Sequence, residues 1–214
     1  KFAATGETKH VNCHYELLHD NLLDLSHVGY VHATTIGNNE MGAKGQIRVE
    51  KLDKGVRVTR WVIDCAPPPT YCKTEIFQPT DRIDRWQIID FTPPAFLRLD
   101  VGATPTGTGA PQGKRVGGIG MRNLNAITPE TETTSHYFWG QAHDFDVNNP
   151  ATSDMLLGQL RTAFMEDVGV FEAQQRNMEL CPDAPQFEIN ADGGLMAARR
   201  ILQRLANEEQ AARG

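Results

Sequence analysis

The segment from Asn21 to His32 combines a carboxylate and two imidazoles at a spacing that could serve a metal ion. Asp24 and His27 share one face of a helix, because residues three apart are neighbours on its surface. His27 and His32 would lie about 140° apart on a regular helix. Both can bind one ion only if the helix breaks between them, and Gly29 stands where that break is expected.

Two imidazoles alone make a poor divalent site, so a third ligand should come from another element. If Phe164 is set at zero on a helix, Leu160 falls at about −40° and Asp167 at about −60°, beside the buried stripe. Glu166 falls at about 200° and is expected to face water. A carboxylate that points into apolar surroundings is costly unless it is paired or coordinated. Coordination of a metal would compensate the free-energy cost of burying the carboxylate of Asp167.

Two histidines and one carboxylate are the ligand set of mononuclear non-haem Fe(II) oxygenases. Zinc hydrolases can also use two histidines and a carboxylate, so ligand chemistry alone leaves both open. A rival group, His10, His14 and His19, has a comparable spacing. It lacks an inward carboxylate and lies largely on a polar side, so we interpret these three as solvated histidines.

The elements that must hold these residues show a helix, a run of strands and two further helices. Leucines at helical spacing predict a first helix from Tyr15 to Leu25. Asp53-Lys54-Gly55 indicates a hairpin, and short connections favour an antiparallel meander, because parallel pairs need long crossovers. Expected strands cover 46–52, 56–58, 71–78, 83–91, 96–101, 116–127 and 133–145, and expected later helices cover 154–178 and 195–211.

Composition narrows the classes of partner. A formal charge of −6 argues against a nucleic-acid or anionic-membrane surface, which would need a basic patch. No stretch is long and apolar enough to span a bilayer, and no leader opens the chain, so we expect a cytoplasmic protein with neither nucleic acid nor membrane as a partner. The four cysteines form no Cys-x-x-Cys pair and are expected to be reduced.

The segment 21–32, Asn-Leu-Leu-Asp-Leu-Ser-His-Val-Gly-Tyr-Val-His, closely resembles the iron-binding motif of Rieske-type aromatic oxygenases in the branch of vanillate O-demethylase oxygenase and dicamba monooxygenase. Phe164-Met-Glu-Asp167, followed by Phe171-Glu-Ala-Gln-Gln175, is similar to the third-ligand helix of that branch, and the segment 128–139 resembles its late hairpin. The resemblance implies an α+β helix-grip (START-like) fold, in which an antiparallel sheet wraps around a long C-terminal helix. Residues 1–214 would then form a single catalytic domain.

The same resemblance assigns roles to residues. His27, His32 and Asp167 resemble the ligands of a mononuclear Fe(II). Asp24 resembles the carboxylate that relays electrons from the Rieske centre of a neighbouring subunit, which implies a homotrimer, and it is also placed to accept the second imidazole N–H of His27. A Rieske [2Fe–2S] cluster needs two cysteines and two histidines in a pattern that this chain lacks. We therefore expect a fragment without an N-terminal Rieske domain.

The implied reaction uses Fe(II) and O2 to hydroxylate or O-demethylate an aromatic, carboxylated substrate, with NAD(P)H acting through a ferredoxin or reductase partner. On its expected strand, His136 could share a face with Asn123 or Asn125 and bind a substrate carboxylate or hydroxyl, although a structural role is equally open. Trp61, Trp86 and Trp139 could line a pocket or pack the core. The alternatives are a metal-free module that binds a hydrophobic ligand and a zinc hydrolase.

Overall fold

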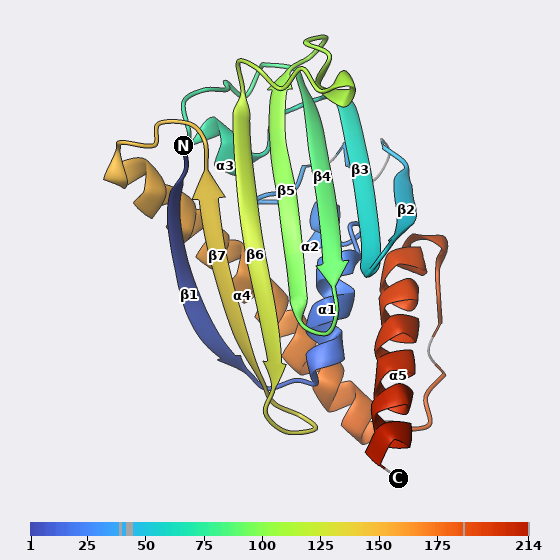
Figure 1. The fold of residues 1–214 in the computed structure, drawn as a ribbon. Coiled ribbons are helices and arrows are strands. Elements are labelled where there is room, and N and C mark those ends of the chain that lie inside the picture. The colour runs from blue at the N-terminus through green and yellow to red at the C-terminus, as the bar shows by residue number, and fades with distance from the viewer. Residues whose placement is uncertain (39, 42–44, 186, 214) are drawn as a thin grey trace.

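The computed structural model describes residues 1–38, 40–41, 45–185 and 187–213. Its centre is a seven-stranded sheet in the order β1-β7-β6-β5-β4-β3-β2, in which every described pair is antiparallel (Figure 1). The predicted meander is therefore confirmed from β2 to β7. The strands are β1 (Ala3–Val11), β2 (Ile47–Leu52), β3 (Gly55–Cys65), β4 (Ile83–Thr92), β5 (Phe96–Pro105), β6 (Ile119–Pro129) and β7 (Ser135–His143).

Two segments differ from the sequence prediction. Strand β1 was not predicted, because its polar residues at one edge of the sheet show no clear apolar alternation. The expected strand at 71–78 is wrong, since this region begins with the short helix α3 (Pro69–Cys72). Proline is favoured in the first turn of a helix because its missing N–H would have no partner there, and Pro69 occupies that position.

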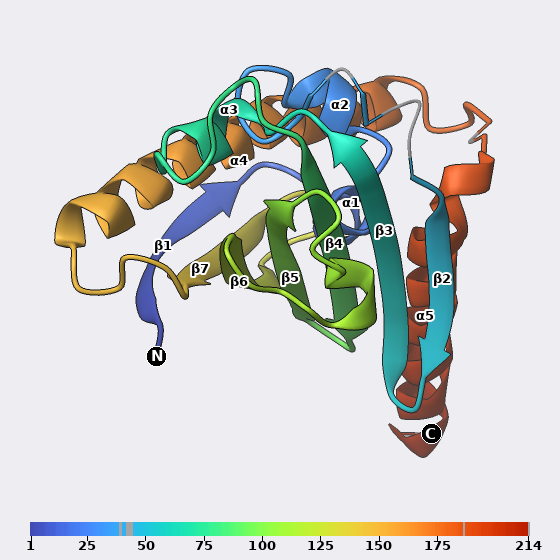
Figure 2. The ribbon, with the colours of Figure 1, turned by 90° about the horizontal axis from the view of Figure 1, so that it is seen from above.

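The helices that carry the candidate site lie on one face of the curved sheet, which we call the inner face. They are α1 (Tyr15–Leu23), α2 (Val28–Val31) and the long α4 (Pro150–Leu180), and Figure 2 shows α2, α3 and α4 together along this side. Helix α5 (Gly193–Arg213) runs beside β2 and β3 (Figure 1). Two single turns, Ala110–Gln112 and Asn190–Asp192, complete the regular structure. The predicted α+β fold with a sheet around a long helix is confirmed.

Apolar side chains of the inner face form two separate clusters. One contains Ile89, Leu97 and Ile127 beneath α1 and α4. The other contains Ile83, Ala103 and Met121 near the opposite ends of the same strands. Polar residues occupy the inner face between them, and we call this set the polar belt: Arg60, Arg85, Gln87, Asn123, Asn125 and Gln141, all buried.

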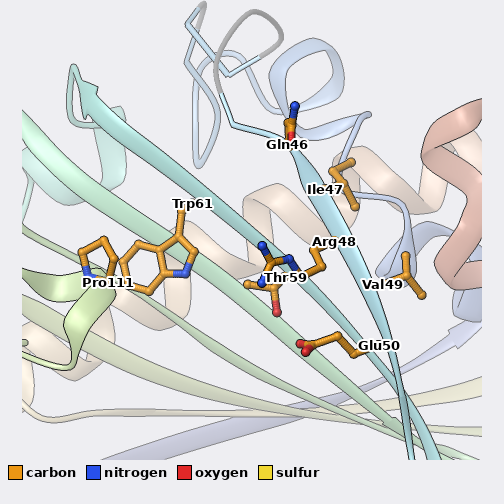
Figure 3. A pocket seen from close by; sticks show the side chains of 8 residues that line it. All are labelled: Gln46, Ile47, Arg48, Val49, Glu50, Thr59, Trp61 and Pro111. Carbon is orange, nitrogen blue, oxygen red and sulfur yellow. The ribbon is translucent and has the colours of Figure 1, made fainter.

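The opposite, outer face carries the first two tryptophans. Trp61 pairs with Trp86 in register, and the guanidinium of Arg115 lies 4.4 Å from the ring centre of Trp86. Only Trp139 points inward, where it packs edge-on against Phe164 with ring centres 5.0 Å apart. Trp139 therefore packs the core, and neither Trp61 nor Trp86 faces the inner side of the sheet. Trp61 lines a groove on the outer face, whose lining residues are shown in Figure 3.

Among the described residues, no helix has both the length and the apolar character that crossing a membrane requires. All four cysteines are unpaired, and two of them, Cys13 and Cys65, are fully buried.

Candidate metal centre

The two histidines of the motif bracket a single helical turn. Helix α1 ends at Leu23, and its C-cap Asp24 is already extended. His27 then precedes α2 and His32 follows it, so one short turn carries both imidazoles. The break predicted at Gly29, between the two histidines, is wrong, because Gly29 is inside α2. The helical path is interrupted before His27 instead, where α1 ends at Leu23. The non-helical segment 24–26 is what frees His27 from the phase of α1.

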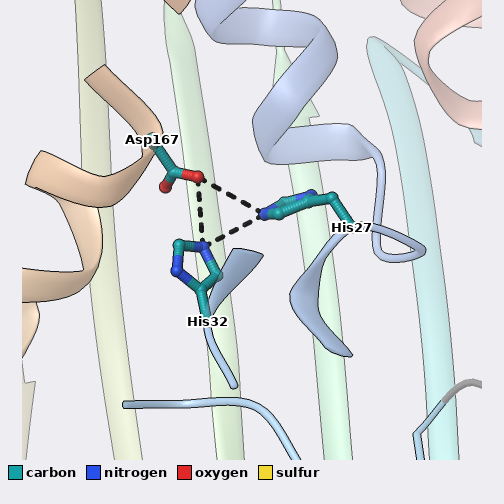
Figure 4. A group of neighbouring side chains, drawn as sticks. All are labelled: His27, His32 and Asp167. Carbon is teal, nitrogen blue, oxygen red and sulfur yellow. Dashed lines mark hydrogen bonds and ion pairs between the residues drawn. The ribbon is translucent and has the colours of Figure 1, made fainter. Parts of the chain in front are cut away.

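The structure brings His27 and His32 together with Asp167 of helix α4 (Figure 4). The two Nε2 atoms are 3.2 Å apart. Oδ1 of Asp167 lies 3.6 Å from Nε2 of His27 and 3.1 Å from Nε2 of His32. His32 and Asp167 are buried, and His27 is nearly so. Three potential ligand atoms thus form a small triangle inside the protein.

The size of this triangle can be compared with known coordination geometry. With bonds of about 2.1 Å, two ligands at a right angle are about 3.0 Å apart, and two ligands in a tetrahedron are about 3.4 Å apart. The observed separations of 3.1 to 3.6 Å span both values. The triangle therefore has the size of a divalent metal site, while its dimensions fit an open octahedral site and a tetrahedral one alike.

The outer hydrogen bond of each imidazole determines which nitrogen carries the proton. Nδ1 of His27 lies 2.5 Å from the carbonyl oxygen of Asp24, and Nδ1 of His32 lies 2.8 Å from the carboxylate of Glu166. A carbonyl or carboxylate oxygen only accepts, so each Nδ1–H donates. In the neutral imidazoles both Nε2 lone pairs then face each other and the carboxylate of Asp167. Three converging acceptors repel unless a cation lies among them, so the donor set fits a metal ion.

Burial and charge act differently on the two imidazoles. Burial lowers the pKa of His27, although the nearby carboxylate of Asp167 opposes this shift. Burial also acts to lower the pKa of His32, but hydrogen bonds and charge from Asp167 and Glu166 outweigh it, and the net pKa is raised. His32 therefore sits in the more negative surroundings of the two, which favour a positive charge at this position.

Glu166 does not face water, and the sequence prediction for it is wrong. Its carboxylate accepts a hydrogen bond from Nδ1 of His32 and another, of 2.9 Å, from Oγ1 of Thr35. The side chain remains about a quarter exposed, because it reaches from the edge of α4 around the imidazole of His32. Its phase on the helix gave no sign of this contact, since phase describes the direction of Cβ and not the reach of a long side chain.

Asp24 lies beside His27 but contacts it through its backbone. Its carboxylate is 3.8 Å from Nδ1 of His27 and instead accepts a hydrogen bond of 2.6 Å from the backbone N–H of Ser26. The expected hydrogen bond from the imidazole to the carboxylate is therefore wrong, because the Asp24 carbonyl takes that place. The side chain is about one fifth exposed.

The triad lines one end of a largely apolar cavity between the helices and the inner face of the sheet. Asn123, which the sequence suggested as a substrate-binding residue, also lines this cavity. His136 does not, because it is paired with Thr128 on the outer face, whereas Asn123 and Asn125 point inward. The expectation that His136 shares a face with either asparagine is wrong. Its imidazole lies 3.5 Å from the exposed carboxylate of Glu130.

The rival histidines do not come together as a site. His10 pairs with Glu130 on the outer face. His14 caps α1 by accepting from the backbone N–H of Glu16. His19 is buried, so the interpretation of it as a solvated histidine is wrong. Among the residues that the structure describes, only His27, His32 and Asp167 bring three potential ligand atoms within 4.8 Å of one another.

Comparison with known proteins identifies the family of the chain that carries this site. The model of the vanillate O-demethylase oxygenase C-terminal domain matches residues 11–208. The chain belongs to this family. The family therefore covers the whole metal triad and nearly all of the described sheet.

Members of the family and solved structures resemble the chain along most of its length. It is 38% identical over 203 residues to the toluene-4-sulfonate monooxygenase system iron-sulfur subunit TsaM1 of Comamonas testosteroni, a match that covers 94% of this chain and 58% of that protein. It is 37% identical to the vanillate O-demethylase oxygenase subunit of Pseudomonas sp. (strain ATCC 19151), with 99% and 65% covered. The crystal structure of dicamba monooxygenase bound to 3,6-dichlorosalicylic acid superimposes with a TM-score of 0.90 at 25% identity and covers 98% of this chain and 61% of that one. The chain thus spans about three fifths of the proteins it matches.

Proposed function

We propose that this chain is the mononuclear iron domain of an oxygenase component that hydroxylates or O-demethylates an aromatic substrate with O2. The observation that carries the proposal is the convergence of three potential ligand atoms, from His27, His32 and Asp167, in the wall of a largely apolar cavity. Membership of the oxygenase family favours iron over zinc at a site whose size fits both.

The residues of the site would have three separate roles: binding the metal, holding the imidazoles and excluding water. The triad would hold Fe(II) on one side and leave its remaining positions open toward the cavity, where the bound iron would supply the activation of O2. Glu166 and the carbonyl of Asp24 hold the imidazoles in the tautomer that a metal requires. Leu160 and Phe164 of α4 and Ile89 of β4 are apolar walls that would exclude water from an aromatic ring.

Electrons would come from a Rieske [2Fe–2S] cluster outside this chain, supplied in turn by a reductase that uses NAD(P)H. The name of the similar protein TsaM1, an iron–sulfur subunit, supports this arrangement. Asp24 is the residue we propose as the entry point, because its partly exposed carboxylate lies next to a metal ligand. Entry from a neighbouring subunit would make the working assembly a homotrimer.

Metal content tests the proposal directly. After anaerobic loading with Fe(II) and removal of excess metal, we expect about one iron per chain by elemental analysis. His27→Ala and Asp167→Ala should each lose this iron, because each removes one of only three ligands. His10→Ala is a matched control, since it deletes an exposed imidazole on the outer face. Asp24→Asn should also retain iron, because its carboxylate is not among the ligand atoms.

Each alternative function predicts a different result. A zinc hydrolase would retain zinc in preference to iron and would act without O2 or an electron donor. A metal-free binding module would hold neither metal, and Asp167→Ala would leave its ligand affinity unchanged. Either pattern would contradict the proposed iron site.

A further inference from the structure

The polar belt and Tyr71 of helix α3 place unpartnered polar atoms in the wall of the cavity that the metal triad also lines. Burying a polar group without a hydrogen bond costs free energy, so most buried polar atoms in proteins have partners. Four residues of this cavity break that rule within the described chain. The unpartnered atoms are Nε of Arg85, Oε1 of Gln87, Oδ1 of Asn123 and Oη of Tyr71.

Of these four residues, Arg85 carries the largest free-energy cost of burial, because its guanidinium is charged. Its side chain is only 2% exposed, yet no carboxylate of a described residue forms an ion pair with it. Its neighbours are a thioether and an aromatic ring: Nη1 lies 3.1 Å from the sulfur of Met41, and the guanidinium carbon lies 5.1 Å from the ring centre of Tyr71. Buried arginines are usually paired with acids, because sulfur is a weak acceptor.

A second positive charge adds to the first on the neighbouring strand. Arg60 of β3 is also buried, and Nη1 of its guanidinium donates to the carbonyl of Leu25. Burial lowers the pKa of Arg60, the charge of Arg85 lowers it further, and the charge of Asp24 opposes the shift. Arg85 itself lines the cavity, so the sheet wall carries a positive charge there.

The opposite wall carries the cavity's single acidic residue among its described lining, Asp167. A divalent ion at the triad would more than neutralise this carboxylate. Once the metal site is filled, the charge of Arg85 has no counterpart in the cavity. A negatively charged group on the bound molecule would supply it.

We propose that Arg85 anchors the anionic head group of the substrate, a carboxylate or a sulfonate, with Gln87, Asn123 and Tyr71 as its polar neighbours. This inference rests on the proposed function and narrows its substrate to an anionic aromatic. The head group would bind the sheet wall near α3, and the ring would lie between this wall and the triad. The amides of Gln87 and Asn123 can turn to offer NH2 groups, and burial raises the pKa of Tyr71, so its hydroxyl remains a donor.

Paired probes test the charge requirement. The Fe(II)-loaded chain is titrated without O2 by calorimetry with vanillate and with toluene-4-sulfonate, and then with the neutral analogues vanillamide and toluene-4-sulfonamide. We expect at least one anion to bind more tightly than its neutral partner. Arg85→Met should weaken binding of that anion by about 10- to 100-fold, since it deletes a charged hydrogen bond in a buried site. It should change the affinity for the neutral analogue by less than about twofold.

Two further variants separate charge from shape. Arg85→Lys keeps the charge and should retain part of the affinity for the anion. Arg98→Met removes the same charge from the outer face of β5, where Arg98 pairs with Asp90, and should leave binding unchanged. Which anion is preferred distinguishes a carboxylate head group from a sulfonate.

Thermal unfolding of the ligand-free chain gives a second readout. Because an unpaired buried charge is replaced by an apolar chain of similar length, Arg85→Met should keep or raise the Tm. A lower Tm with unchanged anion affinity would mean that Arg85 is structural and would overturn the proposal, as would failure of the wild-type chain to bind either anion. Iron content is measured in the same samples. Loss of iron from the wild type would contradict the metal site, whereas loss of anion binding with iron retained would contradict only the anion site.

Discussion

At the level of single residues, the side chain of Glu166 departs from the direction that its helical phase indicates. The prediction from helical phase was correct for Asp167, because a short side chain on the border of a buried stripe cannot reach far from the direction of its Cβ. It failed for Glu166, whose longer side chain reaches the imidazole of His32. The sequence pattern did not indicate that Arg85 faces inward, for a related reason. It lies on β4, where consecutive residues are buried on both faces, so alternation could not separate an inward arginine from an outward one.

Glu166 should matter for metal affinity although it is not among the predicted ligands. Glu166→Ala removes the acceptor of the Nδ1–H of His32 and frees the ring to turn or change tautomer. We expect Fe(II) affinity to fall by about 10- to 100-fold, the usual effect of losing such a partner. Competition with a chelator of known affinity measures the change.

Glu179→Ala is the control, because it removes the same charge from the same helix at an exposed position that accepts a hydrogen bond from Gln175. Equal iron affinity in both variants would show that Glu166 does not position His32. Restoration of affinity in Glu166→Gln, whose amide oxygen can still accept, would indicate that the hydrogen bond matters more than the charge.

At the level of elements, the site depends on a helix of one turn that has little stability of its own. Helix α2 spans only Val28–Val31, and isolated helices of this length do not form in water. The chain after it provides the support. The backbone N–H of Gly37 donates to the carbonyl of His32 with a length of 2.8 Å, and the backbone N–H of Thr35 donates to the same carbonyl with a length of 3.1 Å. Sequence patterns do not reveal such support, because it comes from backbone contacts.

Gly37 tests this dependence. A Cβ at this position would lie 2.3 Å from the carbonyl oxygen of Val28 and 2.8 Å from that of His32, so the backbone that carries the imidazoles must shift. We expect Gly37→Ala to lower the free energy of unfolding by about 1 to 3 kcal/mol, as overpacking does, and to weaken iron binding. Urea denaturation and chelator competition measure the two effects.

Gly169→Ala provides the contrast on helix α4. No atom lies within 4 Å of a Cβ there, although the position is only two residues from Asp167. Alanine is a better helix former, so the variant should gain up to about 1 kcal/mol and bind iron normally. If Gly37→Ala binds iron as tightly as Gly169→Ala does, the loop does not hold the site in place.

At the level of the whole molecule, the polar belt lies between the two apolar clusters of the inner face. The antiparallel meander from β2 to β7 followed from turns and alternation in the sequence. The polar belt could not be predicted in this way, because it forms only when the register of the sheet brings residues of β3, β4, β6 and β7 together. The same limit explains why His136 was assigned to the wrong face, since the register across the β6–β7 hairpin decides its direction.

Global stability should depend on pH through His19, a buried imidazole of α1 in contact with Phe91. Burial, and to a lesser degree the nearby His14, lowers the pKa of His19 to about 4. Neither ring nitrogen has a hydrogen-bond partner within the described chain. The imidazole of an unfolded chain has a pKa of about 6.5, so between these values the unfolded state binds the extra proton. This contribution to stability is therefore complete above pH 6.5 and is lost as the pH falls toward 4.

His19→Leu should remove this dependence. Between pH 7.5 and 4.5 we expect the wild-type chain to lose roughly 2 to 3 kcal/mol more of its free energy of unfolding than the variant does. Urea denaturation of metal-free samples at both values measures the difference, because metal binding at His27 and His32 adds its own dependence on pH. His10→Leu, which replaces an exposed imidazole, should behave like the wild type. If His19→Leu and the wild type lose the same stability over this range, the proton is taken up elsewhere and His19 is not held neutral by the core.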